Sequence, residues 1–142
     1  MVGKRMLFLE CPPLPHDANA EPFRKMGLDV EVHQFFCSEP DAILDEDKYR
    51  FADFDVILIS ISAGIEVARN IIISRELMDR LRKAVQRAEV ERACPIRVIG
   101  MNLGLSGDEQ RAQAEVFDGL FIGWDSTREQ AMQCLGIEPA SP

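Results

Sequence analysis

The amino-acid sequence predicts an α/β fold in which a parallel sheet lies between two layers of helices. Short apolar runs rich in β-branched residues alternate along the chain with segments of helical periodicity. Such alternation implies parallel strands joined by right-handed crossovers. The 142 residues, 46% hydrophobic and 28% charged, suit one packed globular domain. We therefore expect a three-layer sandwich formed by a single domain, residues 1–137, with a frayed tail at residues 138–142.

Five segments are predicted to be strands. Four are short, apolar and β-branched, which is typical of strands buried on both faces: residues 6–9, 56–61, 96–101 and 120–122. In the fifth, residues 28–35, apolar and polar side chains alternate. Because alternation places polar side chains on one face only, this segment is predicted to be an edge strand.

Helices are predicted at residues 21–26, 41–49, within 67–90, at 108–116 and at 127–135. Ser106 with Glu109, and Ser126 with Glu129, have the spacing of a capping box, so they are predicted to begin the last two helices. Five strand–helix units suit a flavodoxin-like sheet in the order 2-1-3-4-5. In that fold, ligands and chemistry belong at the carboxyl ends of the strands, which we call the crest.

Charge and hydropathy argue against several functions. A net charge of −8 leaves no basic face for a phosphate backbone or an anionic membrane, so we expect no nucleic-acid binding and no membrane binding. The apolar runs are far shorter than the roughly 20 residues that span a bilayer, and the amino-terminal residues do not resemble a signal peptide. The four cysteines include no CxxC pair, as expected for reduced thiols in a cytoplasmic protein, and no metal site is predicted.

The amino-terminal half resembles a response-regulator receiver domain. Residues 4–14 are similar to its opening strand and acidic loop, with Glu10 at the position of the first acidic residue. Residues 54–60 resemble its third strand, and here Ser60 stands where the phosphoacceptor aspartate would be.

The resemblance extends toward the carboxyl terminus. Residues 95–102 are similar to the fourth strand of a receiver and place Asn102 at the position of the switch threonine or serine. Residues 119–123 resemble the fifth strand, where Gly123 replaces the lysine. The resemblance thus implies a degenerate receiver site made of Glu10, Ser60, Asn102 and Gly123.

Phosphotransfer in a receiver needs a carboxylate nucleophile, at least two acidic groups for Mg²⁺ and a cation for the acyl phosphate. Ser60, the single acid Glu10 and Gly123 meet none of these needs. We therefore expect a non-catalytic signalling or regulatory module, a pseudo-receiver that acts through protein–protein contacts, with no cofactor. A protein partner or a homodimer is expected, and the long helical segment at residues 69–91 is a candidate contact surface.

A second resemblance supports an alternative function. His16 and Asp17, residues 59–64 and Gly100 are similar to parts of a cobalamin-binding domain, a family with the same fold that uses histidine as its cobalt ligand. The chain lacks the aspartate and the glycine of that family's Asp-x-His-x-x-Gly motif. The alternative function is therefore the binding of cobalamin or another small ligand at the crest.

Several residues in the crest loops are candidate contacts for a ligand or a partner. Gly104 and Gly107 precede a predicted helix, where backbone amides either favour an anion or serve only the turn into that helix. Trp124 follows the last strand and is predicted to be a contact residue. The full set of candidates is His16, Asp17, Ser62, Gly104, Gly107 and Trp124.

Overall fold

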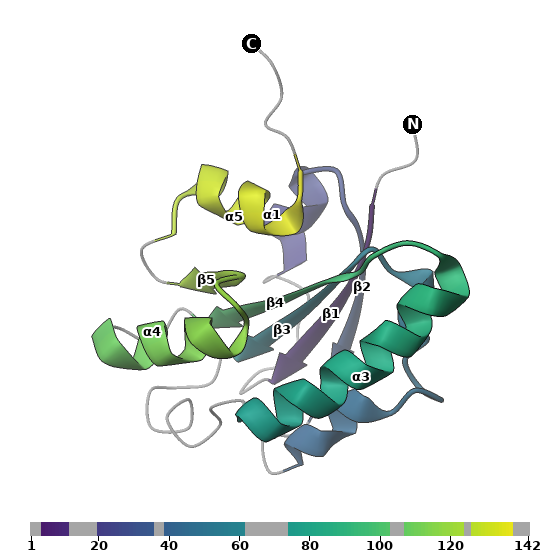
Figure 1. Ribbon diagram of the computed structural model, residues 1–142. Helices are drawn as coiled ribbons and strands as arrows, with labels where there is room; N and C mark the ends of the chain where they lie inside the picture. Colours follow the sequence, from purple (N-terminus) through teal and green to yellow (C-terminus); the bar gives the residue numbers. More distant parts are fainter. Residues whose placement is uncertain are drawn as a thin grey trace.

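The computed structural model describes residues 4–11, 20–35, 39–61, 74–102, 107–123 and 126–137. Within them, five parallel strands form one sheet in the order β2-β1-β3-β4-β5 (Figure 1). The strands are β1 (Arg5–Cys11), β2 (Asp29–Gln34), β3 (Val56–Ile61), β4 (Arg97–Asn102) and β5 (Phe121–Gly123). The predicted flavodoxin-like fold and strand order are confirmed, and β2 lies at an edge of the sheet as expected.

Helices cover both faces of the sheet. On one face lie α1 (Glu21–Lys25) and α5 (Arg128–Leu135), and on the other lie α3 (Arg75–Arg92) and α4 (Gly107–Val116) (Figure 1). The helix α3 also contacts two short 3₁₀-helices, η2 (Pro40–Leu44) and η3 (Phe51–Asp53).

Each face of the sheet has its own hydrophobic core, because successive side chains of a strand point to opposite faces. Met6, Phe8 and Leu58 pack with residues of α1 and α5. Leu7 and Ile57 pack with residues of α3 and of the 3₁₀-helices. Burial on both faces explains why the central strands read as unbroken apolar runs.

The prediction of a helix at residues 41–49 is wrong. Only the 3₁₀-helix η2 forms there, and the chain turns after it. Asp45 provides the physical reason, since its Oδ1 accepts hydrogen bonds from the backbone N–H groups of Asp47 and Lys48, both at 3.1 Å. Such a side chain competes with helical hydrogen bonding and favours a turn. After this turn, the side chains of Tyr49 and Phe51 are buried in the core.

The cap of α5 also differs from the prediction. Thr127, not Ser126, accepts a hydrogen bond from the N–H of Gln130, and the Gln130 side chain accepts one from the N–H of Thr127. Both residues lie one position after the predicted pair. Ser126 instead accepts a hydrogen bond from the N–H of Gly123 at the end of β5. The other predicted cap residue, Ser106, lies outside the described residues.

Candidate functional site

The four residues of the predicted receiver-like site lie at the carboxyl ends of four adjacent strands. The register aligns Glu10 of β1 with Ser60 of β3, and Ser60 with Met101 of β4. Asn102, the last residue of β4, is aligned with Gly123 of β5. The sheet therefore brings Glu10, Ser60, Asn102 and Gly123 to the carboxyl ends of the strands, as the sequence predicted.

The pleat of the strands divides these four residues between the two faces. Glu10 and Ser60 continue the alternation of Phe8 and Leu58, which belong to the core beneath α1 and α5. Asn102 and Gly123 belong to the face that α4 covers. The four positions thus form two pairs, so the crest is not one cluster of converging polar groups.

Burial is the second property of the crest. Glu10, Ser60 and Asn102 are each only 1% exposed. A group that transfers a phosphoryl group from a soluble donor must touch that donor, whereas these side chains lie among other protein atoms. In this conformation the described part of the crest is closed.

On the α4 face, larger side chains lie against the two glycines of β4 and β5. A Cβ at Gly123 would overlap the side-chain amide of Gln110, and a Cβ at Gly100 would lie 2.5 Å from Cε2 of Phe117. Gly123 is therefore covered by a neutral amide from α4.

A buried polar residue of α4 was missed by the sequence analysis. Gln113 is fully buried, three residues after Gln110 and four before Phe117. Residues three and four apart share one face of a helix, so the same spacing that places Phe117 against the sheet also places Gln113 there. Asn102, Gln110 and Gln113 supply the polar side chains between α4 and the sheet.

Of the six loop candidates, only Gly107 lies among the described residues. It is the first residue of α4 and has φ +57°, a conformation that glycine adopts without strain. Asp108 and Glu109 follow in the first turn, and their charges oppose an anion there. His16, Asp17, Ser62, Gly104 and Trp124 lie outside the described residues.

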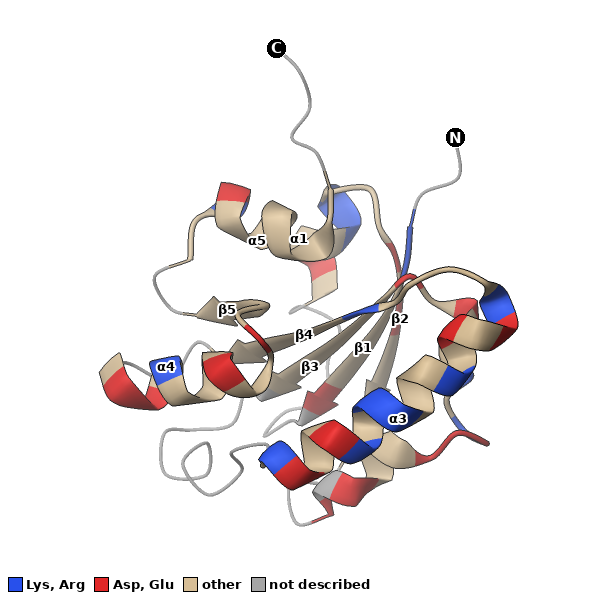
Figure 2. Ribbon diagram, in the orientation of Figure 1, with Lys and Arg blue, Asp and Glu red and all other residues tan. Residues whose placement is uncertain are grey.

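The arginines of α3 are engaged with neighbouring elements. Arg82 pairs with Asp118 at 2.8 Å, and Arg87 donates two hydrogen bonds to Glu46. Figure 2 shows that both signs of charge are distributed along this helix. Arg82 and Arg87 of α3 are thus paired with carboxylates within the domain.

Asp55, just before β3, accepts hydrogen bonds from the N–H of Arg5 at 2.9 Å and from the guanidinium of Arg92 at 2.5 Å. Burial tends to raise the pKa of Asp55, but these hydrogen bonds and the charges of Arg92 and Lys4 outweigh burial and lower it. This pair ties the carboxyl end of α3 to the amino end of β3. It lies at the end of the sheet opposite the crest.

The described residues were searched for metal sites and for helices that could span a membrane. They include no group of three or more His, Cys, Asp or Glu residues that could hold a metal ion. No helix among them is both long enough and apolar enough to cross a membrane.

Comparisons with known proteins give little further information. No protein-family model and no curated protein matches the chain. One similar solved structure is described as "Solution structure of a phosphate-loop protein". It is 16% identical, the alignment covers 78% of this chain and 87% of that chain, and the TM-score is 0.35. A likeness at this TM-score supports no conclusion about function.

Proposed function

We propose that this protein is a non-catalytic regulatory module, similar to a receiver without a phosphoacceptor, that acts through protein–protein contacts. The observation that carries the proposal is the closed crest, where Glu10, Ser60 and Asn102 are each 1% exposed. A buried hydroxyl in the phosphoacceptor position has neither the carboxylate that phosphotransfer needs nor access to a donor.

The environment of Gly123 also supports the proposal. Stabilising an acyl phosphate requires a cation near the acceptor, and Gly123 has no side chain to supply one. The adjoining space holds the neutral amide of Gln110. Gln110 thus fills the position from which a lysine side chain would otherwise extend.

The carboxyl-terminal end of α3 is the contact surface that we propose. Among the described residues, Val90 is the large apolar side chain that is strongly exposed, at 83%. Nearby, Glu91 pairs with Arg50, and Arg92 pairs with Asp55, so the charged neighbours of Val90 already have partners within the domain. A contact at this position would remove the apolar surface of Val90 from water, which is favourable.

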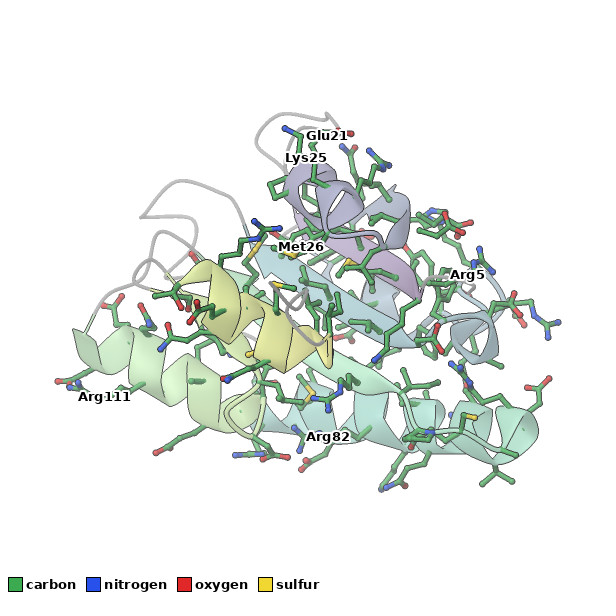
Figure 3. The ribbon with its side chains drawn as sticks, turned by 90° about the horizontal axis from the view of Figure 1, so that it is seen from above. Arg5, Glu21, Lys25, Met26, Arg82 and Arg111 are labelled. Atoms are coloured by element: carbon green, nitrogen blue, oxygen red, sulfur yellow. The ribbon has the colours of Figure 1, made fainter. Side chains whose placement is uncertain are left out.

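Site-specific photo-crosslinking tests this surface. A benzoylphenylalanine in place of Val90 should crosslink to a protein partner or to a second copy of the chain in cells. The matched control position is Arg111, an exposed residue of α4 (Figure 3). Crosslinks from position 90 but not from position 111 support the proposal. Equal crosslinking, or none, at the two positions contradicts it.

The alternative, a cobalamin-like or other ligand-binding function at the crest, is less well supported. The ring of Phe117 lies against Gly100, one of the glycines on which the resemblance to cobalamin-binding domains rests. A visible-spectrum titration with hydroxocobalamin separates the two functions. A spectral shift that is lost in His16→Ala would favour cobalamin binding over the regulatory function.

A further inference from the structure

The two edges of the sheet differ in how their backbone groups are bonded. The edge strands are β2 at one end of the sheet and β5 at the other (Figure 1). An edge strand points the N–H and C=O groups of every second residue away from its neighbour, and such groups can pair with a strand of another chain. Whether these groups already have partners within the domain decides which edge is open to another strand.

The outward backbone groups of β5 have partners within the domain. The pairing with β4 leaves the groups of Phe121 and Gly123 pointing outward. The N–H of Phe121 donates to the carbonyl of Gly119 at 3.0 Å, and the carbonyl of Phe121 accepts a hydrogen bond from Sγ of Cys134 at 3.9 Å. The N–H of Gly123 donates to Oγ of Ser126 at 2.9 Å, and its carbonyl accepts from the N–H of Ser126 at 3.2 Å. This edge is therefore closed to a further strand.

The bonding of β2 to β1 shows which of its backbone groups point outward. The N–H group of Asp29, the first residue of β2, and that of Phe35, which directly follows the strand, both donate to β1. Because bonding alternates from one residue to the next along a strand, the backbone groups of Val30, Val32 and Gln34 point away from β1.

The outward groups of Val32 and Gln34 have no hydrogen-bond partner in the part of the chain that the structure describes. The carbonyl of Val30 accepts one bond, from Nη2 of Arg24, and at 3.3 Å it is longer than most N–H···O bonds. β2 also contains no proline and no lysine, which commonly block an edge strand. Among the described residues, β2 is thus the open edge of the sheet.

The sequence of β2 is complementary to itself when two copies of the strand lie antiparallel. Outward groups must face outward groups, so the register that uses all three outward residues is centred on Val32. Val32 then lies opposite Val32 of the second copy, and Val30 lies opposite Gln34. Glu31 lies opposite His33, so a carboxylate faces an imidazole on each side of the centre. Pairs of β-branched residues and pairs of complementary polar groups stabilise neighbouring strands, whereas like charges directly opposite each other destabilise them.

The carboxylates of β2 already have basic neighbours. Oδ2 of Asp29 lies 3.4 Å from Nε of Arg5, and Oε1 of Glu31 lies 4.0 Å from Nη2 of the same arginine. Nε2 of His33 lies 2.9 Å from Oε2 of Glu31. Two copies of β2 therefore meet without a cluster of unpaired carboxylates, although each chain has a net charge of −8.

From these observations we propose that β2 is the interface of a homodimer, in which two sheets join through antiparallel pairing of β2 centred on Val32. The occupant of the edge is a second copy of the chain, because the outward groups and the side chains both match across the two-fold axis. On pairing, the bond from Arg24 to the carbonyl of Val30 is replaced by one from the N–H of Gln34 of the second copy. This interface is on β2, whereas the regulatory surface proposed above is at Val90 of α3.

Sedimentation equilibrium of the full chain over a range of concentrations tests for the dimer. Val32→Pro should raise the dimer dissociation constant about tenfold, because it removes the two hydrogen bonds that the Val32 residues exchange at the axis. The N–H of Val32 points away from β1, so the bonds between β1 and β2 remain. Val90→Lys should leave the dissociation constant unchanged. A chain that stays monomeric at every concentration would overturn the proposal, as would a dimer weakened by Val90→Lys and not by Val32→Pro.

Val32→Cys provides a second test that leaves every backbone hydrogen bond in place. Opposite residues of a hydrogen-bonded antiparallel pair have α-carbons about 5.5 Å apart, within the reach of a disulfide. The matched control is Gln34→Cys on the same face of β2, because the α-carbons of residue 34 in the two copies would lie about 14 Å apart.

Oxidation with diamide should therefore link the Val32→Cys chains in pairs, measured on a non-reducing gel against the wild-type chain with its own four cysteines. The Gln34→Cys chains should show no more crosslinking than the wild-type chain. Equal crosslinking of the two variants, or crosslinking of neither above the wild-type level, would overturn the proposed register.

Discussion

The side-chain amide of Gln110 lies against the bare α-carbon of Gly123, so α4 reaches across the end of β5. Phe117, seven residues after Gln110 and directly after the last residue of α4, has the same relationship to Gly100. These two contacts set how closely α4 approaches the sheet. The contact of Gln110 with Gly123 also covers the crest on this face.

The two glycines should respond differently to an added methyl group. Gly100→Ala places a Cβ against the rigid ring of Phe117, so we expect a loss of about 1–3 kcal/mol in unfolding free energy, as for an overpacked core. Gly123→Ala meets the flexible end of Gln110, which can move aside, and should cost less. Urea unfolding of both variants measures the difference. An equal loss in the two variants would contradict the account.

Gly136 should be sensitive to substitution for two reasons. Its φ of +72° is strained for any other residue, at about 1–2 kcal/mol, and a Cβ would also meet Arg97 and Lys4. Gly119 is the matched control, since it has φ +84° but no atom within 4 Å of a Cβ. Gly136→Ala should therefore lower the unfolding free energy more than Gly119→Ala. When Arg97→Ala is also present, the losses caused by Gly136→Ala and by Gly119→Ala should become more similar, because Arg97 is the side chain that the new Cβ meets.

The Asp55–Arg92 pair should make stability depend on pH. The pKa of Asp55 is lowered in the folded protein, so its contribution is present above the unfolded pKa, about 3.9, and is lost as pH falls through the folded value. Asp55→Asn should therefore destabilise the protein at pH 7 and matter progressively less as the pH falls below 4. Arg92→Gln should show the same trend. A constant difference between pH 7 and pH 3 would rule out this linkage.

The cap of α5 gives a test of the corrected boundary. Thr127→Ala removes a capping hydrogen bond and should cost about 1 kcal/mol of unfolding free energy. Glu129→Ala should have little effect, because Gln130 and not Glu129 completes the capping box. If the pair predicted from sequence, Ser126 with Glu129, formed the cap, Glu129→Ala would lower the unfolding free energy more than Thr127→Ala.

The strands were predictable because burial on both faces leaves a direct signal in the sequence. Residues 56–61 are uniformly apolar until Ser60, and β3 covers that range. The structure of residues 41–49 was not predictable, because the apolar residues of this segment also fit a helix. The hydrogen bonds by which Asp45 competes with a helix are visible only in the folded structure. The cap of α5 shifted by one residue because Thr127 and Gln130 have the same spacing as Ser126 and Glu129.

For the candidate site, the sequence predicted which residues reach the crest but not how they are oriented. Alternation along each strand places Glu10 and Ser60 on one face and Asn102 on the other. The sequence analysis did not predict the groove of about 600 Å³ at the amino ends of the strands. Lys4, Arg97 and Phe117 are far apart in the chain, and only the folded sheet brings them together.

Intact-mass measurement after incubation with Mg²⁺ and acetyl phosphate tests the central claim, that the protein is a receiver-like module without phosphotransfer. We expect the mass of the wild-type chain and of Ser60→Ala to remain unchanged, because Ser60 is buried and has no carboxylate to offer. A stable phosphorylated species that maps to Ser60 and is absent from Ser60→Ala would contradict the account.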